Sequence, residues 1–116
     1  METIQLGGYR EKTKFRDGQR RLLDALWVDY GGVSEIANVY GISPQSLINW
    51  RLKGGVPFHH IGSVAEILDV PAWALNYTGL SGLGVAVPPS WESVVKACKL
   101  PPEVTEYVLK GTYPSY

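Results

Sequence analysis

The sequence has a single cysteine, Cys98, and it has no long apolar run. One cysteine excludes an intramolecular disulfide and favours the reducing cytoplasm as the compartment. No stretch of apolar residues is long enough to cross a bilayer, and the amino terminus does not resemble a signal peptide. We therefore expect a cytoplasmic protein that makes no contact with a membrane.

The chain also lacks net charge, since 11 basic side chains balance 11 acidic ones. A neutral total argues against nucleic-acid binding, but the basic side chains are unevenly distributed. Between residues 10 and 21 the cations are Arg10, Lys12, Lys14, Arg16, Arg20 and Arg21. We expect residues 1–16 to form a basic arm, with Lys14, Arg16, Arg20 and Arg21 as candidate phosphate contacts. The alternative is an ordinary solvated, flexible terminus.

Patterns typical of catalytic or metal sites are absent from the sequence. The two histidines, His59 and His60, are neighbours and would diverge on a helix, so we expect histidines at a surface or a helix start. The segment Lys53-Gly54-Gly55 is too short for a phosphate-binding loop. Paired carboxylates and Ser/His/Asp sets do not stand out either. The sequence therefore predicts no enzyme, no cofactor, no metal and no small-molecule substrate.

What the sequence does contain is enough apolar and aromatic material for a packed core, with 45% hydrophobic residues and four tryptophans. Asp17 is the expected cap of a first helix over 18–30. Helical spacing of apolar residues predicts further helices over 33–40, 44–52 and 58–68, and a short last turn over 72–76. We expect Trp50 and Trp73 in this core. The predicted organisation is all-α, with a five-helix domain over 17–77, a linker over 78–89 and a helical hairpin over 90–116.

The most informative stretch is 33–52, VSEIANVYGISPQSLINWRL. Gly41 stands where the first helix must stop, because glycine adopts a left-handed C-terminal conformation without steric cost. Ser43 can cap a second helix, and Pro44 suits its first position. In that helix Leu47 and Trp50 share one face. This is the plan of a helix-turn-helix.

With its flanks, this stretch resembles the phage Cro/repressor class of helix-turn-helix regulators, in particular the small YdaS/Cro-like proteins. The resemblance is carried by GGVSEIANVYGISPQSLINW, the following LKGGVP and the later VAEILDVPAWALN, which together cover about half of the chain. It implies a λ-repressor-like fold and sequence-specific binding to double-stranded DNA. By position it implies base contacts from Pro44, Gln45, Ser46, Ile48 and Asn49 and phosphate contacts from Ser34, Arg51 and Lys53.

The carboxyl-terminal segment repeats the spacing of apolar residues and proline found in the motif. Val94, Leu100 and Pro102 follow Ile36, Ile42 and Pro44 by 58 residues. The segment 90–116 is either a degenerate second helix-turn-helix or a packing or dimerisation element, and its lysine at 99 and outward Glu103 and Glu106 favour the latter. We expect Cys98 to be a small buried residue of this segment.

One recognition helix reads few base pairs, so the expected DNA-binding form is a homodimer or a higher homo-oligomer. The favoured function is a transcriptional regulator of phage or prophage type. Two alternatives stay open: a small subunit of a phage terminase, which would bind DNA for packaging, and a helix-turn-helix module that binds protein.

Overall fold

The computed structural model describes residues 9–110, and it describes their side chains from residue 17 onward. The elements are α1 (Tyr9–Tyr30), α2 (Val33–Tyr40), α3 (Pro44–Lys53), α4 (Phe58–Leu68), the 3-10 helix η1 (Ala72–Ala74), α5 (Tyr77–Gly82), α6 (Trp91–Ala97) and α7 (Pro102–Lys110). Within the described range every regular element is a helix, which confirms the all-α class. No helix in that range is long and apolar enough to span a membrane.

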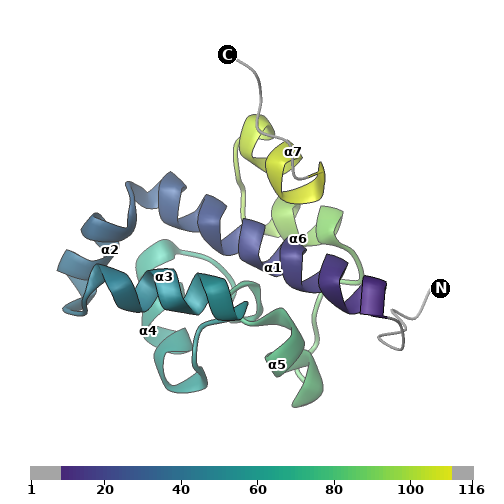
Figure 1. The fold of residues 1–116 in the computed structure, drawn as a ribbon, viewed down its shortest axis with the longest axis horizontal. Helices are drawn as coiled ribbons and strands as arrows, with labels where there is room; N and C mark the ends of the chain where they lie inside the picture. The colour runs from purple at the N-terminus through teal and green to yellow at the C-terminus, as the bar shows by residue number, and fades with distance from the viewer. Residues whose placement is uncertain (1–8, 111–116) are drawn as a thin grey trace.

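Helix α1 is the longest element, and α2, α3 and α7 pack directly against it (Figure 1). The pair α2–α3 contacts one side of α1, and α7 contacts another. Five buried residues of α1 contribute to the core: Leu22, Leu23, Ala25, Leu26 and Trp27. Gly18 lies inside α1 rather than at its start, and a Cβ there would come within 2.9 Å of the Trp91 ring. The glycine therefore leaves room for the Trp91 ring against α1.

The start of α1 differs from the prediction. The sequence predicted a helix from about residue 18 with Asp17 as its cap, whereas the helix begins at Tyr9 and Asp17 is in its interior. Arginine, lysine and glutamate have good intrinsic helix propensity, so a helix anchored by packing further along can extend back through them without an apolar stripe. Of the predicted basic arm, residues 1–8 lie outside the described residues, as do the side chains of Lys14 and Arg16.

The core predictions for the tryptophans hold to different degrees. Trp50 is buried, whereas Trp73 is only partly buried and packs against the core from η1. Gln19 is the one polar residue buried in the described core, and both ends of its amide are bonded: Nε2 donates to the Ala74 carbonyl (2.9 Å) and Oε1 accepts from the Tyr77 N–H (2.8 Å). This amide fixes η1 and the start of α5 against α1.

The predicted linker over 78–89 is only partly a linker, because its first residues belong to α5. The Asn76 side chain caps this helix by accepting from the Gly79 N–H (3.1 Å), and it donates to the Val56 carbonyl (3.0 Å). Tyr77 is buried and its hydroxyl donates to the Pro88 carbonyl. Hydrogen bonds of Asn76 and Tyr77 therefore hold both ends of the segment 76–88 in place, while Leu83 and Val85 in its middle are exposed.

The carboxyl-terminal pair α6–α7 repeats the pair α2–α3 with an offset of 58 residues. Helix α6 begins 58 residues after α2, and α7 begins 58 residues after α3. The inner residues correspond as well: Ile36 and Val94 are both fully buried, and Trp50 and Val108 are both buried. The turn residues Gly41 and Lys99 share a positive φ, 84° and 56°. The hairpin predicted over 90–116 is thus present through Lys110, and its last six residues lie outside the described range.

Replacing Lys99 with glycine is expected to stabilise the protein. A non-glycine residue in the left-handed region costs about 1–2 kcal/mol, and the greater freedom of glycine in the unfolded chain offsets about 0.5–1 kcal/mol of the gain. We expect Lys99→Gly to raise the free energy of unfolding by about 0.5–1 kcal/mol, measured by urea denaturation. The matched control is Lys96→Gly, inside α6, which should lower it by about 1 kcal/mol. Equal losses for both variants would contradict the left-handed turn.

Cys98 ends α6 and is buried, as the sequence predicted. Burial raises the pKa of its thiol to about 11, so the thiol stays protonated at neutral pH. A protonated, buried thiol is a poor nucleophile, and Cys98 acts as a small apolar residue of the core.

Candidate nucleic-acid interface

The pair α2–α3 is joined by a tight turn over residues 41–43. Gly41 closes α2 in the left-handed conformation, and its N–H donates to the Ala37 carbonyl (2.8 Å) together with that of Ile42 (3.1 Å). The Ser43 hydroxyl caps α3 by accepting from the Ser46 N–H (3.3 Å), and Pro44 occupies the first helical position. Each of these local features is the one predicted from the sequence.

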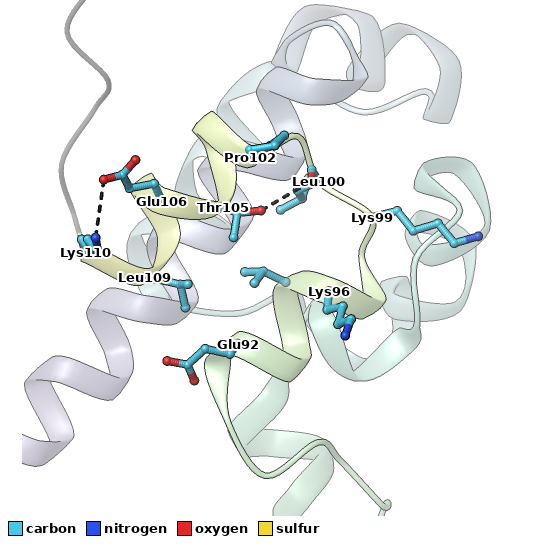
Figure 2. A pocket seen from close by; sticks show the side chains of 10 residues that line it. Glu92, Lys96, Lys99, Leu100, Pro102, Thr105, Glu106, Leu109 and Lys110 are labelled. Atoms are coloured by element: carbon cyan, nitrogen blue, oxygen red, sulfur yellow. Dashed lines mark hydrogen bonds and ion pairs between the residues drawn. The ribbon is translucent and has the colours of Figure 1, made fainter.

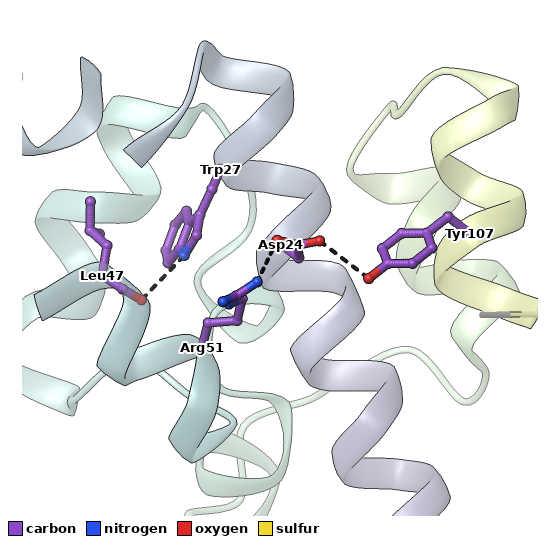
Figure 3. Close-up of polar contacts among 5 residues, drawn as sticks. All are labelled: Asp24, Trp27, Leu47, Arg51 and Tyr107. Atoms are coloured by element: carbon purple, nitrogen blue, oxygen red, sulfur yellow. Dashed lines mark hydrogen bonds and ion pairs between the residues drawn. The ribbon is translucent and has the colours of Figure 1, made fainter. Parts of the chain in front are cut away.

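The inner face of α3 anchors the helix to the core. Leu47 is fully buried and Trp50 is buried. Trp27 of α1 packs against this face, and its indole Nε1 donates to the Leu47 carbonyl (3.3 Å), as Figure 3 shows. A carbonyl in the middle of α3 is thereby tied to α1, so the direction of α3 relative to α1 is fixed by packing and by a buried hydrogen bond.

The outer face of α3 carries the residues predicted to contact bases. Pro44, Gln45 and Asn49 are exposed, while Ser46 and Ile48 are partly buried. The Gln45 Nε2 donates to the Asn49 Oδ1 (3.1 Å), one helical turn away. This bond uses one N–H of Gln45 and one lone pair of the Asn49 oxygen, so it orients both amides and leaves each of them a donor and an acceptor for an outside partner. The Ser46 hydroxyl lies 3.1 Å from that of Ser43 and is part of the cap.

The residues predicted to contact phosphates differ in their exposure and in their partners within the chain. Ser34, in the first turn of α2, and Lys53, at the end of α3, are exposed. Arg51 instead forms an ion pair with Asp24 of α1, with 2.8 Å between its Nη1 and the carboxylate. The Arg20 Nε donates to the Leu52 carbonyl (2.9 Å), and the Arg21 Nε donates to the Val108 carbonyl (3.0 Å). Three of the predicted cations are therefore engaged within the chain.

No protein-family model matches this chain, and neither does any curated protein or solved structure.

Asp24 links three helices, which sequence reasoning missed. One carboxylate oxygen accepts from Arg51 of α3, and the other accepts from the Tyr107 hydroxyl of α7 (3.2 Å), as Figure 3 shows. Asp24 thus connects the outer end of α3 to the carboxyl-terminal pair through α1. No local pattern marks it, because Tyr107 lies 83 residues from Asp24 along the chain.

A second missed contact involves His60. Its Nδ1 lies 2.7 Å from the Tyr40 hydroxyl of α2, and its ring packs on Trp50 of α3 with centroids 4.9 Å apart. The prediction that both histidines belong to a helix start is correct, since α4 begins at Phe58, but only His59 is exposed. His60 joins α2, α3 and α4. Among the described side chains there is no cluster of three metal-ligand residues.

Removing the Asp24 carboxylate is expected to destabilise the fold. Asp24→Ala leaves Arg51 and Tyr107 without this acceptor, and because the site is partly exposed we expect a loss of about 1–2 kcal/mol in the free energy of unfolding. The measurement is urea denaturation. Asp17→Ala is the matched control: its pair with Arg20 is 3.8 Å long and exposed, so the loss should stay below about 0.5 kcal/mol. A loss for Asp24→Ala no larger than for Asp17→Ala would argue against the link.

Proposed function

We propose that this protein binds double-stranded DNA in a sequence-specific manner and acts in the cytoplasm as a transcriptional regulator of phage or prophage type. In this proposal α2 and α3 form a helix-turn-helix within a λ-repressor-like five-helix domain. Helix α3 enters the major groove, and the protein binds as a homodimer. The observation that best supports the proposal is the outer face of α3, where the Gln45 and Asn49 amides are bonded to each other and exposed on a rigidly held helix.

The chemistry of this face suits adenine and thymine. In a bidentate pair a side-chain amide donates to N7 and accepts from the N6 amino group of adenine. An apolar side chain such as that of Ile48 can pack on the thymine methyl group. Because the Gln45–Asn49 bond already orients both amides, less side-chain entropy is lost when they meet base edges. A preference for A·T pairs at the centre of each half-site follows from this arrangement.

The charge of the surface indicates how strong the binding is. Each neutralised phosphate contributes about 0.9 to the slope of log affinity against log salt. Within the pair α2–α3 the cations are Arg51 and Lys53; Arg51 is paired to Asp24, and Lys53 at the end of α3 is exposed. We therefore propose binding with a shallow salt dependence, in which base contacts carry much of the affinity.

The test is an electrophoretic shift with the DNA upstream of the protein's own gene, over a salt series, against a scrambled duplex of equal length. The proposal predicts retardation of the upstream DNA at low salt and weaker retardation of the scrambled duplex. Absence of retardation at low salt, with a folded protein, would refute it.

A second candidate is a helix-turn-helix module that binds protein. It is favoured by the neutral net charge and by the engagement of Arg20, Arg21 and Arg51 within the chain. Under this alternative the Gln45/Asn49 face contacts a partner protein. The two candidates differ in the shift experiment, because only the first predicts that DNA is retarded.

A further inference from the structure

The helices α6 and α7 leave an open groove between them, shown in Figure 2. Its volume is about 620 Å³. Apolar side chains from both helices and from the turn between them line it, namely Val95, Leu100, Pro102 and Leu109. Such an apolar floor can form the buried centre of an interface whose rim is polar.

The charged residues on the rim of the groove are separated by sign. Lys96 and Lys99 lie on the side toward the α6–α7 turn, whereas Glu92 and Glu106 lie on the opposite side, as Figure 2 shows. Lys110 is also on the acidic side, where its Nζ is 3.6 Å from the Glu106 carboxylate. Within the described part of the chain, Glu92, Lys96 and Lys99 take part in no ion pair. The rim thus has a basic and an acidic side.

The outer face of α7 argues against DNA as the occupant. With the offset of 58 residues, Glu103 and Glu106 occupy the places on α7 that Gln45 and Ile48 occupy on α3, and both are exposed. Carboxylates at these places repel phosphates. The helices α6 and α7 therefore begin at positions that correspond to α2 and α3, but the outer surface of α7 is unsuited to DNA.

We propose that the groove between α6 and α7 is the surface on which a second copy of this chain docks, related by a two-fold axis. In a two-fold contact the same patch faces itself, so the basic side of one copy meets the acidic side of the other, twice. The sign-separated rim satisfies this requirement, and the apolar floor supplies the buried centre. The need for a dimer rests on the proposed function, whereas the groove and its charges do not.

The test is sedimentation equilibrium of the full chain without DNA, over a range of protein concentrations. We expect twice the chain mass of 12.8 kDa. Two charge-reversal variants, Lys96→Glu/Lys99→Glu and Glu92→Lys/Glu106→Lys, should each raise the dimer dissociation constant at least about tenfold. Mixed in equal amounts, they should form heterodimers, because both contacts are then attractive. The control Glu35→Lys/Glu66→Lys changes the charge as much as the second variant but on α2 and α4, and should dimerise normally.

Each outcome is informative once circular dichroism shows that the variants are folded. A wild-type monomer, undisturbed dimers of both variants, or a mixture that stays monomeric would each overturn the groove as the dimer surface. Because no DNA is present, the result is separate from the proposed function. A dimer that retards no DNA refutes only that function. A monomer that retards DNA refutes this inference and the dimeric form, and leaves the proposed DNA binding itself standing.

Discussion

Under the proposed function, Gln45→Ala/Asn49→Ala is expected to abolish the preference for a specific duplex over unrelated DNA, without unfolding the protein. A good bidentate contact to a base contributes about 1–3 kcal/mol of discrimination, so losing two costs about 2–6 kcal/mol, or at least about 30-fold in Kd. Both side chains are exposed, and their mutual bond is a surface one, so the fold should lose little. The measurement is the ratio of Kd values for specific and scrambled duplexes.

The matched control is Asn38→Ala, which removes the same amide from an exposed position on α2. Exposed substitutions away from a binding contact usually change a free energy by no more than about 0.6 kcal/mol, which is about threefold in Kd. Asn38→Ala should therefore leave the ratio of the two Kd values within about threefold of the wild-type ratio. An unchanged ratio in the double variant, with binding intact, would mean that α3 does not read bases.

The second large effect is expected for Trp27→Ala. The indole is 2% exposed, packs α1 against α3 and donates to the Leu47 carbonyl. Truncating a buried tryptophan to alanine costs about 3–5 kcal/mol, through lost burial and the cavity left behind. Small domains have only about 5–15 kcal/mol of stability, so the variant should lose a large part of it. Urea denaturation, with the m-value compared between variants, measures the loss.

Val28→Ala is the neighbouring control, because Val28 is 61% exposed on the same helix. Its cost should stay within about 0.5 kcal/mol. If the two variants lost similar free energy, the packing of α1 against α3 would be different from that described. DNA binding by Trp27→Ala should fall with the folded fraction, since Trp27 holds α3 in place without reaching its outer face.

The parts of the fold that sequence reasoning predicted well are those specified by nearby residues. Helix α4 has the predicted bounds, 58–68, and the turn before α3 follows from Gly41, Ser43 and Pro44. Caps, left-handed glycines and apolar spacing act over a few residues, so the chain displays them directly. The exposed Gln45 and Asn49 were found in the same way, from their position on an anchored helix.

The parts that were missed depend on residues far apart in the chain. Helix α5 forms in the predicted linker because Asn76 caps it and because the Tyr77 N–H donates to the Gln19 side chain. Gln19 lies 58 residues before Tyr77 in the chain. Arg51 pairs with Asp24 because α1 brings the carboxylate to α3, and the sequence did not predict this ion pair. Such pairings follow from tertiary packing, which local propensity does not specify.

The most direct test of the central claim, that the outer face of α3 reads DNA, is an NMR titration of the ¹⁵N-labelled full chain. The titrant is the tightest duplex selected from a random library. We expect the largest shifts at the backbone amides of residues 44–49 and at the side-chain amides of Gln45 and Asn49. Shifts centred on α6 and α7, or no shifts at low salt, would contradict it.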